Sequence, residues 1–168
     1  MFISSSKDCN LKLIDFGMST TFYSIDQVKG KGEYERMNST VGTAYFMAPE
    51  LFEDDYNQSC DMWSVGIILY LMLGGYPPFD GDTEEEIFKS IKKQSYSFEE
   101  DIWTGVSDQA KGLISKLLVS ENDRLSPKEA LKHPWFSIVK EEPEKTNSEI
   151  SSNHIKKLKK FQDLKNFK

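Results

Sequence analysis

The longest apolar run of the chain covers residues 61–73, where Ser64 is the only side chain after the opening aspartate that is not apolar. Apolar residues fall on every face of a helix drawn through this run, and such a helix is typical of a protein core. It would be roughly 20 Å long at 1.5 Å per residue, too short for a bilayer, which needs about 20 apolar residues. Asn57 or Ser59 can cap its start, and the glycines at 74–75 predict its end. The run predicts a central helix buried on all sides; a pair of buried strands is the competing interpretation, which the unbroken length disfavours.

Three further helices are expected after the central one, each with a polar cap. Thr83 and Glu86 form a capping box, Ser107 caps the next helix, and residues 126–129 form a second capping box with proline at the first helical position. Apolar residues recur at helical spacing behind the first two caps. The inward positions are Ile87 and Ile91 in the first of these helices, and Ala110, Leu113, Ile114, Leu117 and Leu118 in the second.

Composition and charge describe an ordinary soluble protein. The 168 residues fit one domain or part of a larger one, and apolar and charged contents of 38% and 29% exclude a disordered or fibrous chain. The net charge of −6 does not favour a nucleic-acid partner, and no signal peptide or membrane-spanning run is visible. Two cysteines, Cys9 and Cys60, indicate a reducing compartment, so a cytoplasmic location is expected. Acidic runs at 53–55, 80–86 and 99–101 are interpreted as solvated faces.

Short motifs follow one another in a defined order. Two short predicted strands, Phe-Ile at 2–3 and Leu-Lys-Leu-Ile at 11–14, flank a polar turn. This pattern predicts a β-hairpin that leads into Asp-Phe-Gly at 15–17. Residues 42–50 end in Ala-Pro-Glu, and residues 61–66 read Asp-Met-Trp-Ser-Val-Gly. A single D-F-G occurs often by chance. The order of strand, D-F-G, loop, A-P-E and D-x-W-S-x-G, however, resembles the second half of a eukaryotic protein kinase.

Later segments extend this resemblance over nearly the whole chain. Gly-Tyr-Pro-Pro-Phe at 75–79 and Asp-Arg-Leu-Ser at 123–126 resemble kinase segments, and His-Pro-Trp-Phe at 133–136 looks like the closing motif of calmodulin-kinase-like catalytic domains. The resemblance implies a mainly α fold, the helical C-terminal lobe of a serine/threonine kinase with a small β-hairpin and no N-terminal lobe. Residues 1–140 would form this partial kinase domain, and residues 141–168 a linker and a basic regulatory helix.

The resemblance assigns contacts with ATP and Mg²⁺ to the D-F-G region. Asp15 would hold a Mg²⁺ ion that bridges the ATP phosphates, because carboxylates suit this hard cation. Phe16 would pack so as to set the active or inactive loop. The implied cofactor-binding residues are Ile14, Asp15, Phe16 and Gly17. An aspartate that only turns the chain after the hairpin is the structural alternative.

Residues 18–41 resemble an activation segment. Ser39 and Thr40 are candidate phosphorylation sites there, although a plain polar loop is the alternative. Thr43 matches the threonine that bonds the catalytic aspartate in serine/threonine kinases, which favours that specificity over tyrosine. The substrate-binding positions implied are Val41, Gly42, Thr43, Ala44 and Met47. Ordinary core packing is the alternative for Met47.

Three residues have an architectural role by resemblance. Glu50 would pair with a buried Arg124, and breaking such a pair costs about 3–5 kcal/mol. Asp61 would accept backbone N–H bonds from the catalytic loop. Leu71 stands where some kinases that prefer basic substrates carry a glutamate, which leaves the substrate preference open.

Several parts of a kinase do not occur in the printed sequence. It contains no glycine-rich phosphate loop, no strand lysine in a V-A-I-K context and no H-R-D-x-x-x-x-N catalytic loop. The general base belongs to that last motif. No catalytic residue is therefore assigned, and this polypeptide alone is expected to be inactive. We also expect exposed apolar surface on the central helix, with a tendency to associate.

The last segment, residues 151–168, is basic, with six lysines against one aspartate for a charge of +5. Its apolar residues recur about every third position. They are Ile155, Leu158, Phe161, Leu164 and Phe167. Such a helix is typical of calmodulin targets and membrane surfaces. Behind a kinase lobe it resembles the autoinhibitory junction of calcium-dependent protein kinases.

That resemblance implies two partners for the intact enzyme, protein substrates and a calmodulin-like EF-hand domain beyond Lys168. The domain would bind residues 150–168 when loaded with Ca²⁺ and withdraw the helix from the substrate cleft. The alternatives are a non-catalytic truncated lobe that recruits a calmodulin-like partner, or a solvated terminal helix. Membrane attachment is the weaker hypothesis, and no membrane or nucleic-acid partner is expected.

Overall fold

The computed structural model describes residues 12–21, 37, 43–141 and 152–165. The chain divides into two compact units, Met1–Glu35 and Arg36–Lys168. In the first unit the described residues form neither helix nor strand, with a turn at Gly17 and Met18. Most of the predicted hairpin lies outside the described residues, and the prediction is wrong for residues 12–14, which form no strand.

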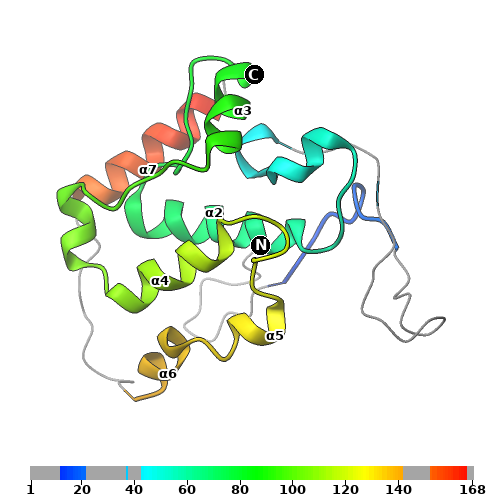
Figure 1. Cartoon of the computed structure of the whole chain (residues 1–168). Helices are drawn as coiled ribbons and strands as arrows, with labels where there is room; N and C mark the ends of the chain where they lie inside the picture. Colours follow the sequence, from blue (N-terminus) through cyan, green and yellow to red (C-terminus); the bar gives the residue numbers. More distant parts are fainter. Residues whose placement is uncertain (1–11, 22–36, 38–42, 142–151, 166–168) are drawn as a thin grey trace. The chain divides into compact units, whose positions relative to one another are not determined.

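The second unit is mainly helical, as the sequence predicted (Figure 1). Its elements are η1 (Ala44–Phe46), η2 (Pro49–Glu53), α2 (Cys60–Gly74), α3 (Glu84–Lys93), η3 (Asp101–Gly105), α4 (Asp108–Leu117), α5 (Pro127–Ala130), α6 (Pro134–Glu141) and α7 (Ser152–Lys165), where η denotes a 3-10 helix. Within the described residues the one β-type pairing is an antiparallel bridge between Met37 and Tyr56. No helix in these residues has the length and apolar content needed to cross a membrane.

Helix α2 begins and ends close to the predicted positions. Gly75 adopts the left-handed conformation (φ 78°), and its N–H donates to the Leu71 carbonyl at 2.8 Å. A glycine has no Cβ to oppose this conformation, so the chain leaves the helix here at little cost. At the other end, the Asn57 side chain accepts from the Ser59 N–H at 2.8 Å, whereas the Ser59 side chain makes no capping bond.

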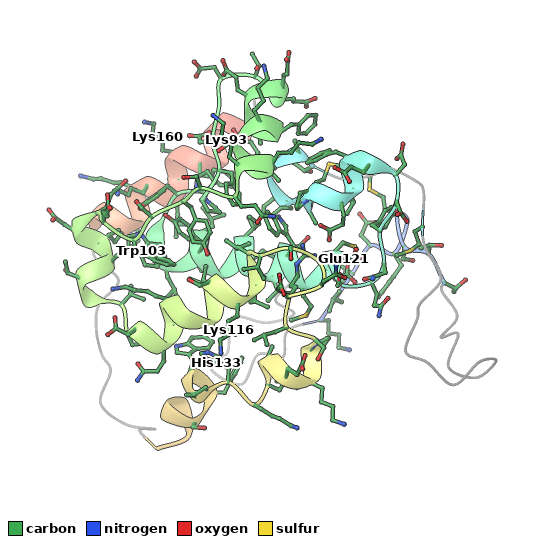
Figure 2. All side chains as sticks on the ribbon, in the orientation of Figure 1. Lys93, Trp103, Lys116, Glu121, His133 and Lys160 are labelled. Atoms are coloured by element: carbon green, nitrogen blue, oxygen red, sulfur yellow. The ribbon has the colours of Figure 1, made fainter. Side chains whose placement is uncertain are left out.

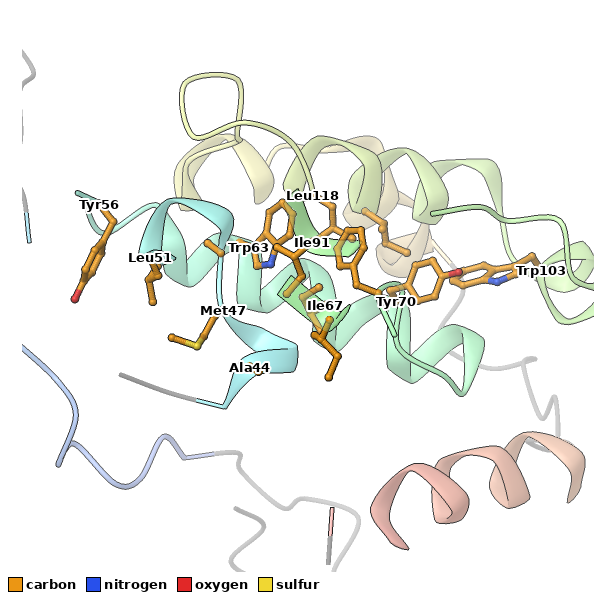
Figure 3. Close-up of a cluster of buried hydrophobic side chains, with 14 residues drawn as sticks. Ala44, Met47, Leu51, Tyr56, Trp63, Ile67, Tyr70, Ile91, Trp103 and Leu118 are labelled. Carbon is orange, nitrogen blue, oxygen red and sulfur yellow. The ribbon is translucent and has the colours of Figure 1, made fainter. Parts of the chain in front are cut away.

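Most of α2 is packed into one continuous core. Figure 1 shows α2 running between α4 and α7, and the core side chains follow its length from Tyr56 to Trp103 (Figure 3). Trp63 and Ile67 are at most 1% exposed. Gly66 permits the close approach of α4, because a Cβ there would lie 2.8 Å from Leu118 Cδ2. The buried side of α2 is thus the axis on which the lobe is assembled.

One face of α2 contradicts the prediction of burial on all sides. Val65, Ile68 and Met72 are 45%, 46% and 63% exposed. These positions follow the i, i+3, i+7 spacing and therefore share one side of the helix. The described helices that pack on α2 cover its other sides. This is the exposed apolar surface that the sequence also predicted; self-association through it stays a prediction.

The predicted helix caps are present. Thr83 with Glu86 and Ser126 with Glu129 form complete capping boxes, and the Ser107 hydroxyl accepts from the Ala110 N–H at 3.3 Å. The predicted inward positions of α3 and α4 are all at most 2% exposed. These are Ile87, Ile91, Ala110, Leu113, Ile114, Leu117 and Leu118.

Candidate functional site

Asp15, the predicted magnesium ligand, lies on an exposed turn of the first unit. It has a left-handed backbone (φ 66°), which an aspartate adopts more readily than most residues. Its Oδ1 accepts from the Gly17 N–H at 3.3 Å. An exposed carboxylate of this kind fits Mg²⁺, which proteins often hold through one or two carboxylates together with substrate phosphates. The local bond to Gly17 also agrees with the alternative that Asp15 turns the chain.

The other predicted cofactor contacts lie beside Asp15 and face solvent. Ile14 is 57% and Phe16 67% exposed, and the Phe16 carbonyl accepts from the Ser19 N–H at 3.0 Å. Within the described residues no group of three or more histidine, cysteine or acidic side chains is placed to hold a metal ion. The D-F-G residues are exposed among the described residues of the first unit, and their role in binding a nucleotide stays a prediction.

The predicted substrate-binding segment is held against α2. The Ser64 hydroxyl, on α2, donates to the Phe46 carbonyl at 2.9 Å and so fixes η1 to the helix. Thr43 is exposed immediately before η1, while Ala44 and Met47 are 9% and 8% exposed. The burial of Met47 agrees with the core-packing alternative. Val41, Gly42, Ser39 and Thr40 lie outside the described residues.

Glu50 and Arg124 form the ion pair that the sequence predicted. The Arg124 guanidinium donates to both Glu50 carboxylate oxygens, from Nη1 to Oε1 and from Nη2 to Oε2, the latter at 3.0 Å. It also donates to the carbonyls of Ser59 and Val119 at 3.0 Å and lies over the Trp63 ring, 5.2 Å from its centroid. The Arg124 side chain is fully buried. Such a bidentate pair ties η2, α2 and the α4–α5 connection together.

Asp61 lies exposed in the first turn of α2. There its negative charge suits the positive end of the helix dipole. Its predicted bonds to a catalytic loop involve a segment that the printed sequence does not contain.

His133 is buried directly before α6. Its Nδ1 accepts from the Trp135 N–H at 3.4 Å, within the turn that begins α6. Burial first, and then the positive charge of Lys116, lower the pKa of His133 below its usual value (Figure 2). The neutral imidazole is thereby favoured, which suits a hydrogen-bond acceptor.

Helix α7 rests on the lobe at the C-terminal end of α2. The Lys157 ammonium lies 2.7 Å from Glu100 Oε2 and 4.8 Å from the centroid of the Tyr76 ring. The Phe161 ring meets Tyr45 edge-on at a centroid distance of 5.5 Å. Of the predicted tail residues, Ile155 is 42% exposed and Leu158 partly buried, while the side chain of Leu164 and all of Phe167 lie outside the described residues.

A groove of about 330 Å³ lies between α7 and the lobe. Its lining consists of Tyr45, Gly75, Tyr76, Pro77, Asp80 and Glu100 from the lobe and Lys157, Lys160 and Phe161 from α7. The Tyr45 hydroxyl donates to Asp80 Oδ1 at 3.4 Å. Burial first, and then the Asp80 carboxylate, raise the pKa of Tyr45 above its usual value of 10.0. Tyr45 therefore stays protonated and acts as a donor at neutral pH.

Sequence reasoning missed the lobe side of this contact. The sequence predicts a solvated face for the acidic run that contains Glu100, yet Glu100 pairs with a lysine 57 residues away. Tyr45 and Tyr76 belong to recognised motifs, but neither was singled out. The opposite charges of the 99–101 run and the basic tail are the sequence feature that could have predicted this contact.

Comparison with known proteins gives a consistent assignment. Residues 1–136 match the family model described as protein kinase domain. The chain is 40% identical to calcium-dependent protein kinase 3 of Plasmodium yoelii yoelii over 141 residues, 83% of this chain and 25% of that protein. It is 33% identical to calcium-dependent protein kinase 5 of Plasmodium falciparum over 98% of this chain and 28% of that protein. It is 36% identical to calcium-dependent protein kinase 27 of Oryza sativa subsp. japonica over 100% of this chain and 26% of that protein.

The chain thus spans about a quarter of the length of the curated relatives it matches. The family match covers the D-F-G turn, the segment after it, the Glu50–Arg124 pair and the helices up to the start of α6. On these grounds the chain belongs to the protein kinase domain family.

Proposed function

We propose that this chain is the substrate-binding and regulatory part of a calcium-regulated serine/threonine protein kinase, which transfers the γ-phosphate of ATP to hydroxyl groups of proteins. One observation carries the proposal: helix α7 packs against the lobe of a chain that belongs to the protein kinase family. Lys157 and Phe161 contact Glu100 and Tyr45, and Tyr45 is two residues from Thr43. A helix in this position obstructs the approach of a peptide to the segment that would bind it.

The residues of the nucleotide site have separate tasks in this proposal. Asp15 would hold Mg²⁺, and Ile14, Phe16 and Gly17 would line the bound ATP. The cation neutralises charge on the transferring phosphoryl group, which is most of what catalysis of this reaction requires. The general base would come from a segment that the printed sequence does not contain.

Thr43 would position the substrate hydroxyl, with Val41, Gly42, Ala44 and Met47 shaping the pocket beside it. Ser39 and Thr40 are candidate sites of regulatory phosphorylation. A phosphate there adds nearly two negative charges, which can order a loop through contacts with arginine. These roles follow from the match of residue types to the family motifs.

Release of α7 would be the regulatory step. A calmodulin-like EF-hand domain binds an amphipathic helix through its apolar anchors. Phe161 is one such anchor, yet its ring already packs on Tyr45. The lobe and the EF-hand domain would therefore compete for the same side chain, so binding of the Ca²⁺-loaded domain would favour the open lobe. Residues 1–140 and 141–168 would be the two functional parts, and the paucity of cysteines favours a cytoplasmic location.

The 168-residue polypeptide is expected to transfer no radiolabelled phosphate from ATP to a mixed protein substrate above the blank. The reason is the missing general base, since Asp15 alone supplies no proton acceptor for the substrate hydroxyl. The coding sequence upstream of Met1 is then read from the transcript. A polypeptide that adds an encoded H-R-D and glycine-rich loop should transfer phosphate to serine and threonine in a Ca²⁺-dependent manner.

Two results would contradict the proposal. Label on tyrosine alone would exclude serine/threonine specificity, and an upstream sequence without these motifs would favour a non-catalytic lobe that binds a calmodulin-like partner. The matched control is the longer polypeptide with Asp15→Asn. It keeps the side-chain size but removes the negative charge that a Mg²⁺ site needs.

A further inference from the structure

The Lys157 ammonium occupies a site on the lobe that has two distinct means of binding a cation. The Glu100 carboxylate forms an ion pair with it at 2.7 Å, and the face of the Tyr76 ring lies 4.8 Å from it. A carboxylate and an aromatic face attract a cation by different physical effects, charge and ring quadrupole. The Lys157 side chain is 31% exposed, so this site is reached from the surface.

The site is built by the lobe and not by α7. The Tyr76 hydroxyl accepts from Trp103 Nε1 at 2.8 Å, and its oxygen lies 3.3 Å from the Tyr70 hydroxyl oxygen. Trp103 is fully buried, so it holds the Tyr76 ring from the core side. Glu100 directly precedes η3 and occupies its N-cap position. These anchors all come from the lobe, and none of them depends on a contact with Lys157.

The charges around the groove favour a basic ligand. On the lobe side, the charged residues of the lining are the carboxylates Asp80 and Glu100, whereas both lysines of the lining come from α7. Withdrawal of α7 would leave an acidic and aromatic wall that begins beside Tyr45. Charge complementarity then selects a positively charged segment as the occupant.

We infer that Glu100 and Tyr76 form a subsite for a lysine or arginine side chain of a protein substrate, and that Lys157 fills this subsite in the structure. The identity of the ligand as a substrate rests on the proposed kinase function. The sequence left the preference for basic substrates open, because Leu71 replaces the glutamate that some kinases use. Glu100 and Tyr76 supply a cation site at a different place, on the loops that follow α2 and α3.

An arginine should bind this subsite better than a lysine. Its planar guanidinium can stack on the Tyr76 ring and donate two parallel hydrogen bonds to the Glu100 carboxylate, whereas an ammonium is a compact point charge. A higher affinity for arginine than for lysine would therefore show that the Tyr76 ring contributes to binding as well as the Glu100 carboxylate.

The test is peptide binding to the 168-residue chain, measured by fluorescence anisotropy without ATP or metal. The probes are fluorescein-labelled alanine-based peptides that carry several lysines, the same number of arginines, or glutamines. The Lys157→Met substitution removes the ammonium from the subsite and keeps an apolar side chain of similar length. It should raise the affinity for the lysine peptide about 5- to 10-fold, because the tethered lysine no longer competes. The arginine peptide should bind more tightly still, and the glutamine peptide should gain nothing.

Three further variants separate the subsite from general electrostatics. Lys156→Met removes the same charge from an exposed neighbour outside the groove lining and should leave the affinities unchanged. Glu100→Gln added to Lys157→Met should abolish the gain, whereas Glu99→Gln should not. Equal effects of Lys156→Met and Lys157→Met, persistence of the gain in the Glu100→Gln variant, or no peptide binding to any variant would each overturn the inference. Because no phosphoryl transfer is measured, these results are independent of whether the proposed kinase activity is correct.

Discussion

Replacing Arg124 by methionine should lower the free energy of unfolding by about 3–5 kcal/mol, a large part of the stability of a domain this size. The substitution leaves the Glu50 carboxylate, 10% exposed, without its counter-charge. It also removes the donors to the Ser59 and Val119 carbonyls and the cation over Trp63. Urea titration followed by circular dichroism measures the loss. A chain already unfolded without urea would agree with the upper end of this range.

An exposed pair of the same lobe supplies the matched control. Lys89 and Glu85 are 2.8 Å apart on α3 with side chains 67% and 78% exposed, and Lys89→Met should cost at most about 0.5 kcal/mol. The double variant Glu50→Gln, Arg124→Met should lose less stability than the sum of the two single-variant losses. Each single change leaves the partner's buried charge unpaired, and the other change removes that charge. An Arg124→Met variant as stable as Lys89→Met would show that the buried pair does not hold the lobe together.

Truncation of Trp103 to alanine should also cost about 3–5 kcal/mol. The indole is fully buried, with ring centroids 4.6 Å from Tyr70 and 4.8 Å from Phe98. It fits so closely against α2 that a Cβ at Gly74 would lie 2.6 Å from Trp103 Cζ2. Alanine would leave a cavity at the C-terminal end of α2 and remove the donor to Tyr76. The same urea titration measures the change.

A phenylalanine at position 103 separates packing from hydrogen bonding. Trp103→Phe keeps most of the ring volume and loses the bond to Tyr76, so it should cost only about 1–2 kcal/mol. Alanine and phenylalanine variants of equal stability would show that this aromatic cluster does not contribute through packing. Because Trp103 donates a hydrogen bond to Tyr76, both variants should also weaken the contact between the Tyr76 ring and the Lys157 ammonium.

Local features of the sequence predicted their elements well. The capping boxes of α3 and α5 act over three residues, and the stripe of α4 repeats at helical spacing, so neighbouring residues determine both. The 3-10 helices η1, η2 and η3 are not predicted by the sequence, because segments this short carry no periodic signal. The predicted strand at 12–14 failed for a related reason, since a short apolar run takes its conformation from its partners.

Contacts between residues far apart in the sequence could be identified only from a family pattern or from the structure. The Glu50–Arg124 pair joins residues 74 apart and was expected only through the resemblance to kinases. Nothing local distinguishes Glu100, which receives Lys157, from its neighbour Glu99. The exposure of Val65, Ile68 and Met72 depends on which elements pack on α2, and an apolar pattern alone does not state which faces of a helix are covered.

The most direct test of the regulatory account is a distance between α7 and the lobe in solution. Nitroxide labels at Lys93→Cys in α3 and Lys159→Cys in α7, both exposed, would be measured by double electron–electron resonance, with Cys9 and Cys60 changed to serine. The account predicts one narrow distance distribution for the free chain, which Ca²⁺-loaded calmodulin broadens or shifts and Ca²⁺-free calmodulin leaves unchanged. A broad distribution in the free chain, or one that Ca²⁺-loaded calmodulin does not alter, would contradict it.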